Sequence, residues 1–174
     1  MPVKTIMSLV MLGIVYLIVS AYKKVDKTVD EYKLKRNPDD IPTLEKLLLS
    51  DIIAKNDDHA WEVAEHILEI DPNNLLALIY QAVLYHECEE YENSKPILKR
   101  IEPQLSDSGV LQALKNKFFS LTDGKKMDLV MALIAKGLYF NGHILFMAGQ
   151  IEQANQWKKK AKGFDRSALD LNLY

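Results

Sequence analysis

Apolar residues follow two different patterns along the chain. Residues 5–22, TIMSLVMLGIVYLIVSAY, form an uninterrupted run without a formal charge, and the run ends at Lys23 and Lys24. A helix of that length rises about 27 Å, at about 1.5 Å per residue, and the hydrocarbon core of a bilayer is about 30 Å thick. The run therefore predicts a transmembrane anchor over residues 1–22, with residues 5–22 inside the lipid bilayer.

The alternative for this run is a cleaved signal peptide. Val19-Ser20-Ala21 satisfies the small-residue rule for cleavage after Ala21. However, only Lys4 precedes the apolar residues, and lysines follow the cleavage position directly. These flanks favour a retained signal anchor over a removed leader.

Basic residues predict the orientation of the anchor. Lys4 and the amino terminus precede it, whereas six basic residues follow it between positions 23 and 36. The positive-inside rule then predicts a cytoplasmic C-terminal domain, while an ordinary signal anchor with its N-terminus inside would place that domain in a periplasm or lumen. Residues 23–40 are predicted to form a basic juxtamembrane linker, which either contacts anionic head groups or serves only as a stop-transfer flank.

From residue 41 onwards, apolar residues recur three and four positions apart, and no alternating strand pattern occurs. This period predicts an all-α domain over residues 41–174. A longer period is also present, because Leu44, Ala60, Ala64 and Ile67 are answered 34 residues later by Leu78, Ser94, Leu98 and Ile101. Self-similarity at this distance indicates repeated supersecondary units.

This repeat resembles the tetratricopeptide repeat (TPR) family, whose unit is a pair of antiparallel helices. The stretch HAWEVAEHILEIDPNN is the most typical, with Ala60 at the small position of the second helix and Pro72 twelve residues further on. The resemblance predicts units at 41–74, 75–108 and 135–168, with a helical insertion at 109–134. The second unit departs from the family pattern at Pro96, which we expect to be tolerated only in the first turn of a helix.

The resemblance implies stacked helical hairpins with a concave groove lined by the first helix of each unit. Carried onto this chain, the predicted partner groove consists of Leu49, Ile53, Ile79, Val83, His86, Lys136, Tyr139, His143, Phe146 and Met147. Because most of these residues are apolar, we expect the groove to take an apolar or amphipathic helix or peptide of a partner protein. Alternatively, another part of the chain fills the groove, such as the insertion helix or residues 23–36.

Residues 129–149 offer a second candidate membrane span, since Lys136 is their only charged residue. Lys136, Asn141 and His143 lie near the middle of the segment. A lysine at the centre of a membrane span costs about 2.5–3.5 kcal/mol. We therefore expect a buried core helix here.

The composition does not favour catalysis or nucleic-acid binding. The 22 basic and 24 acidic residues give a net charge of -2, without the positive excess that binds phosphates. The single cysteine, Cys88, cannot by itself form an intramolecular disulfide or a thiolate metal site, and His59 and His66 are two helical turns apart. HExxH, P-loop, GxGxxG and GxSxG motifs do not occur. We predict no catalytic, cofactor or metal site, and no enzymatic activity.

Together these patterns predict a membrane-anchored, TPR-like protein-protein interaction scaffold or adaptor. Such a protein holds a partner at the membrane, where confinement raises the effective concentration of partners that reside there. The alternatives are a permanent accessory subunit of a larger membrane complex and, less in keeping with the motifs, an enzyme.

Overall fold

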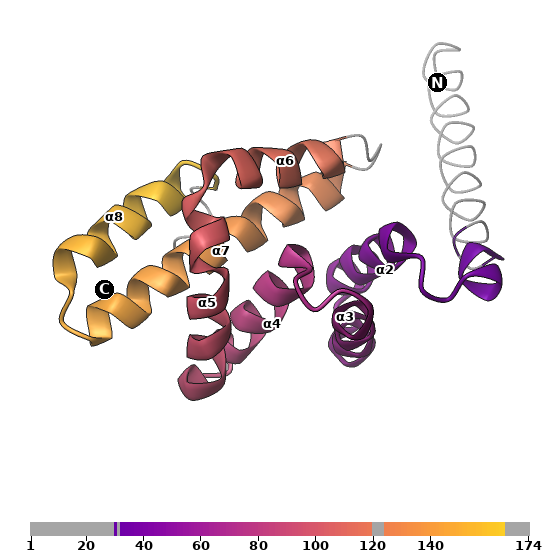
Figure 1. The fold of residues 1–174 in the computed structure, drawn as a ribbon, viewed down its shortest axis with the longest axis horizontal. Coiled ribbons are helices and arrows are strands. Elements are labelled where there is room, and N and C mark those ends of the chain that lie inside the picture. The colour runs from indigo at the N-terminus through magenta and orange to yellow at the C-terminus, as the bar shows by residue number, and fades with distance from the viewer. Residues whose placement is uncertain (1–29, 31, 120–123, 166–174) are drawn as a thin grey trace, which may run out of the picture. The chain divides into compact units, whose positions relative to one another are not determined.

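The described part of the chain is built from α-helices. The computed structural model describes residues 30, 32–119 and 124–165, and every regular element within these ranges is helical (Figure 1). The predicted all-α class is thereby confirmed. The predicted transmembrane anchor, residues 1–22, lies outside these ranges. The chain divides into two compact units, Met1–Thr43 and Leu44–Tyr174.

The helices follow one another with short connections. In chain order they are α2 (Ile41–Ala54), α3 (Asp57–Ile70), α4 (Leu75–Glu87), α5 (Tyr91–Ser106), α6 (Ser108–Phe119), α7 (Gly124–Met147) and α8 (Ile151–Lys162). α7 is the longest and begins eleven residues before the predicted third unit. The predicted insertion therefore contains α6 except its first residue, Ser108, together with the first turns of α7.

Three of the turns between helices are closed by the same hydrogen-bond pattern. At each turn one residue has a positive φ, namely Lys55 (57°), Glu89 (62°) or Gly149 (79°). Its N–H donates to the carbonyl three residues earlier, and the next N–H donates to the carbonyl five residues before it, at 2.8 to 3.1 Å. This is the Schellman motif, which satisfies the last carbonyls of a helix and reverses the chain.

The spacing of these three turns follows the repeat found in the sequence. Lys55 and Glu89 are 34 residues apart, and Glu89 and Gly149 are 60 apart. The second distance equals one 34-residue repeat plus the 26 residues of the predicted insertion 109–134. Each turn thus lies at the same position of its predicted unit, 14 residues after the first residue of that unit.

α7 is the central helix of the compact unit Leu44–Tyr174. It packs against α4, α5, α6 and α8, while α4 packs against α3, α5 and α7. Tyr139 and Phe140 of α7 are among the largest fully buried side chains. In Figure 1, α7 and α8 run side by side as a hairpin. Gly142 of α7 and Ala154 and Ala161 of α8 are all buried, so small residues occupy this helix pair.

The burial of α7 bears on the second candidate membrane span. Among the described residues, one helix, Lys126–Met147, is long and apolar enough to cross a membrane by length and composition. Of its 18-residue apolar window, 61% is buried within the domain. This burial favours the interpretation of α7 as a core helix.

Two prolines lie within α5. Pro96 is in the second turn of the helix, so the expectation that it is tolerated only in the first turn is wrong. A proline there leaves the carbonyl four residues earlier without its N–H donor. Pro96, Pro103 and the corresponding carbonyl residues Glu92 and Lys99 are all exposed, so water can take the place of the missing donors.

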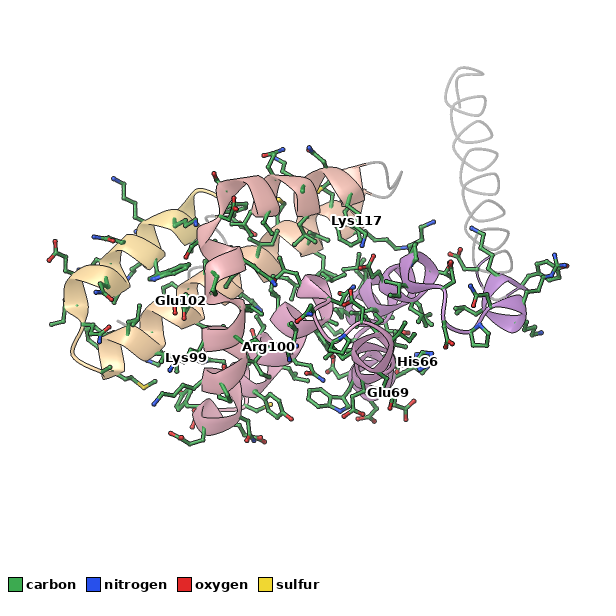
Figure 2. All side chains as sticks on the ribbon, in the orientation of Figure 1. His66, Glu69, Lys99, Arg100, Glu102 and Lys117 are labelled. Carbon is green, nitrogen blue, oxygen red and sulfur yellow. The ribbon has the colours of Figure 1, made fainter. Side chains whose placement is uncertain are left out.

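A buried carboxylate joins three helices of the second unit. Glu45 of α2 is 1% exposed. Its Oε1 accepts a hydrogen bond from Asn74 Nδ2 at 2.8 Å, and Nζ of Lys117, labelled on α6 in Figure 2, lies 2.6 Å from Oε2. The other amide atom, Asn74 Oδ1, accepts from Ala77 N at 3.1 Å and so caps the start of α4. The position of α6 is thus coupled to those of α2 and α4.

We expect glycine exchanges at the Schellman turns to report backbone strain. Gly149→Ala should lower the free energy of unfolding by about 1 kcal/mol, because the left-handed conformation disfavours a Cβ atom. Glu89→Gly should cost less than about 0.5 kcal/mol, since relief of strain offsets the extra entropy of the unfolded chain. The measurement is urea unfolding of the full chain in detergent, followed by circular dichroism.

Gly124→Ala is the matched control for these exchanges. A Cβ atom at Gly124 would meet nothing within 4 Å, and the residue does not have a positive φ. This variant should be at least as stable as the wild type. Equal losses at Gly149 and Gly124 would contradict the assigned turn geometry.

We expect Lys117→Met to lower the free energy of unfolding by about 1–3 kcal/mol, because it leaves the Glu45 carboxylate buried with one donor fewer. Lys136→Met is the control, since Lys136 and its partner Glu87 are 30% and 37% exposed. A pair of that exposure contributes less than about 1 kcal/mol. Equal effects in urea unfolding would argue against a special role for Glu45.

Candidate functional site

Most of the predicted partner groove is inside the domain. Of the ten predicted residues, six are at most 8% exposed: Leu49, Ile79, Val83, His86, Tyr139 and His143. These six side chains do not line an open surface in this structure. A partner cannot reach them while the helices are packed as described.

The cause is the packing of α7 against α4. The α4 face that carries Ile79, Val83 and His86 lies in the α4–α7 contact, where a Cβ added at Gly137 would stand 3.4 Å from Ile79 Cγ2. The first helix of the third predicted unit therefore covers the first helix of the second. The expected alternative, a groove filled by the chain itself, agrees with this arrangement, in which the covering helix α7 includes residues 124–134 of the predicted insertion.

The remaining four predicted residues reach the surface. Ile53 at the end of α2, and Phe146 and Met147 at the end of α7, are 40%, 39% and 49% exposed. Lys136 forms an ion pair with Glu87 across the α4–α7 contact. Sequence reasoning did not include Ile151, which is 56% exposed at the first position of α8. The sequence feature that could have indicated this exposed position is an apolar residue directly after the turn at Gly149-Gln150.

A cavity of about 600 Å³ extends along α8 from this turn, between α8 and α5. It is lined by Glu102, Ser106, Glu152, Gln153, Gln156, Trp157 and Lys160. Lys160 Nζ donates to the carbonyls of Leu105 and Ser106 at 2.6 and 2.7 Å, and lies 5.4 Å from the Trp157 ring centroid. Burial lowers the pKa of Lys160, and the charge of Asp107 opposes this shift.

His86 and His143 form a buried pair between α4 and α7. They are 3% and 8% exposed, and His86 Nε2 lies 2.9 Å from His143 Nδ1. The Phe140 ring stacks on His86 with the centroids 4.1 Å apart. Tyr91 of α5 contacts both imidazoles edge-on, at 4.8 and 5.7 Å. Three helices therefore surround the pair.

A hydroxyl fixes the direction of the hydrogen bonds in this cluster. Ser94 Oγ donates to the Ala82 carbonyl at 3.0 Å, so its lone pairs face His86 Nδ1 at 3.4 Å. The pattern then assigns the His86 proton to Nδ1, and His86 Nε2 accepts from His143 Nδ1. Burial, with a smaller contribution from His143, lowers the pKa of His86 to about 4, and burial also lowers the pKa of His143. Both rings are neutral at pH 7.

Other reactive groups do not converge on a reaction site. Cys88, at the C-cap of α4, is exposed, whereas His86 is buried. His59 pairs with Asp51 at 2.8 Å. Tyr80 is buried, and burial together with Asp57, Asp51 and Glu87 raises its pKa to about 12. Within the described ranges, no group of three or more His, Cys, Asp or Glu residues is placed to hold a metal ion.

The first unit contains a basic hollow. Tyr32, Lys33, Arg36, Asn37 and Asp40 surround a space of about 390 Å³, and the Arg36 guanidinium lies 5.6 Å from the Tyr32 ring centroid. Tyr32 is 60% exposed. An exposed aromatic residue, Tyr32, thus lies beside two of the basic residues of the predicted juxtamembrane linker.

Comparison with known proteins adds no assignment. No family model matches the chain. No curated protein matches it either.

Proposed function

We propose that the chain is a membrane-anchored helical scaffold of the TPR type that holds a protein partner at the membrane. The observation that carries this proposal is the recurrence of one Schellman turn at the same position of three units, interrupted by an insertion of defined length. Repeated helical hairpins of this kind serve as binding scaffolds because neighbouring units build an extended surface. No catalytic role is part of the proposal.

The order of helix contacts supports a stack of hairpins. α4 contacts α3 from the unit before it, its own partner α5, and α7 from the unit after it. α7 in turn contacts α5 and α8. In a solenoid each unit contacts only its neighbours along the chain, and these contacts follow that rule, with α6 added beside α7.

The burial of the α4–α7 face moves the proposed partner surface to the α7–α8 hairpin. Met147 and Ile151 flank its turn and are about half exposed, at 49% and 56%. The cavity between α5 and α8 continues from this turn and adds carboxylates, amides and an indole ring. Apolar anchors beside a polar rim suit an amphipathic helix or peptide, with the apolar side chains supplying most of the binding energy.

Membrane attachment is proposed from residues 5–22 and the basic linker that follows. Each basic residue close to an anionic surface contributes about 1 kcal/mol, and Lys33 and Arg36 lie beside an exposed tyrosine, a residue type typical of the membrane interface. The orientation with the helical domain in the cytoplasm follows from the excess of basic residues after position 22.

We expect the full chain to stay with membranes after alkaline carbonate extraction, and a variant lacking residues 2–22 to be released. Sidedness is read from Cys88, the single cysteine, which is exposed at the end of α4. A membrane-impermeant maleimide should label it only after lysis. Release of the full chain by carbonate would contradict the anchor, and labelling in intact cells would place the domain on the other side.

We expect the double variant Met147→Glu with Ile151→Glu to lose a photo-crosslink to its partner at least tenfold, because both apolar anchors become charged. Ile70→Glu is the matched control, since Ile70 is an exposed apolar residue on α3, at 36%. Crosslinking in native membranes is followed by purification in mild detergent and a salt wash. A partner that resists the wash identifies a permanent subunit, and equal crosslinking of both variants would exclude this surface.

A further inference from the structure

The histidine pair lies in the contact that hides the predicted groove. Phe140 stacks on His86, and the covered apolar residues Ile79 and Val83 precede His86 by two turns and one turn on α4. His143 faces it from α7 through the 2.9 Å hydrogen bond. A change in this bond therefore acts on the packing of α7 against α4.

We propose that the His86–His143 pair is an acid-sensitive latch, which holds α7 against α4 when both rings are neutral and releases this contact when they are protonated. The released contact would expose the apolar face of α4. This inference depends on the geometry of the pair alone, and so stands or falls independently of the membrane anchor and the partner surface.

The hydrogen-bond pattern suits two neutral rings, and a single added proton can keep the N–H···N bond only at the cost of a buried charge. Ser94 Oγ and His143 Nδ1 already determine the role of each His86 nitrogen, with one donating and one accepting. One added proton places a positive charge on a ring that is 3% exposed. A second proton sets two N–H groups against each other across 2.9 Å. Either event favours a state in which the rings reach water.

Charged and titratable side chains also lie on the helices around the pair. Tyr91 of α5 contacts both rings, Glu87 follows His86 directly on α4, and Lys136 and Lys158 lie on α7 and α8. Glu87 and Lys136 form an ion pair with each other, and Lys158 lies over the Tyr139 ring, 5.7 Å from its centroid. The causes of the two pKa shifts are burial and, for His86, the neighbouring His143, and both act against the charged form.

The direction of the pH effect follows from the shifts. Both histidines have a lower pKa in the closed state than the ordinary value of 6.5. At pH values between the closed-state pKa and 6.5, the open state therefore binds more protons than the closed state. The contact is therefore at full strength above pH 6.5 and weakens as the pH falls towards 4. For His86 alone, a pKa of 6.5 in the open state and about 4 in the closed state raises the opening constant about 30-fold between pH 8 and pH 5.

Hydrogen exchange of the full chain in detergent micelles tests this proposal. Protection factors, corrected for intrinsic exchange rates, are measured by mass spectrometry at pH 7.5, 6.0 and 5.0. We expect peptides from α4 and α7 to lose about 10- to 30-fold in protection at pH 5, whereas peptides from α3 lose less than threefold. Equal losses in all helices would indicate general acid unfolding and overturn the latch.

The variant His86→Gln with His143→Asn places amides where the ring nitrogens are and removes the titration. Its response to pH in α4 and α7 should shrink below threefold. His66→Gln, a change at a half-buried histidine of α3 outside the α4–α7 contact, is the matched control and should keep the full response. A double variant with the wild-type response would refute the proposal.

A second measurement needs no variant. The ¹³Cε1 chemical shift of His86 in the wild-type chain should titrate with a midpoint below pH 5, assigned by its disappearance in His86→Gln. A midpoint near 6.5 with α4 and α7 still protected would show that the protonated ring is accommodated, and would overturn the latch.

Discussion

The arrangement of the helices in the compact unit Leu44–Tyr174 depends on the burial of α7. α7 contacts α4, α5, α6 and α8. Its aromatic residues Tyr139 and Phe140 are among the largest fully buried side chains. The same contact decides which surfaces the domain presents, because it closes the face of α4 that a repeat scaffold would normally leave open. A helix apolar enough to enter a membrane is here mostly buried in the interior of the domain. Its buried His143 contacts partners on α4 and α5.

The architecture was predictable because its signals are local. Apolar spacing of three and four residues identifies helices. The 34-residue period predicted repeated units, and the Schellman turns, which were not predicted from the sequence, recur at the same position in each of them. The start of α7 was not predictable in the same way. Nothing in the repeat pattern distinguishes an insertion that ends in a separate helix from one that extends the following helix, as residues 124–134 do.

The exposure of the groove could not be derived from the sequence. A repeat position states which face of a helix a residue occupies, whereas burial depends on which other helix lies there. Ile79 and Tyr139 were assigned to a surface by position and are fully buried by contact. The histidine pair was hidden for a related reason, since its members are 57 residues apart and the Ser94 hydroxyl that orients them comes from a third helix. Lys136 and Glu87 likewise meet only across the α4–α7 contact.

The end of α5 has an unusual dependence on a distant residue. Its last carbonyls, those of Leu105 and Ser106, are capped by Lys160, which lies 55 and 54 residues further along the chain. During synthesis, the ribosome completes α5 well before this lysine emerges, so the nascent helix ends in solvated carbonyls until α8 has docked. The sharp break between α5 and α6 at Asp107 thus acquires this support only after α8 has been synthesised.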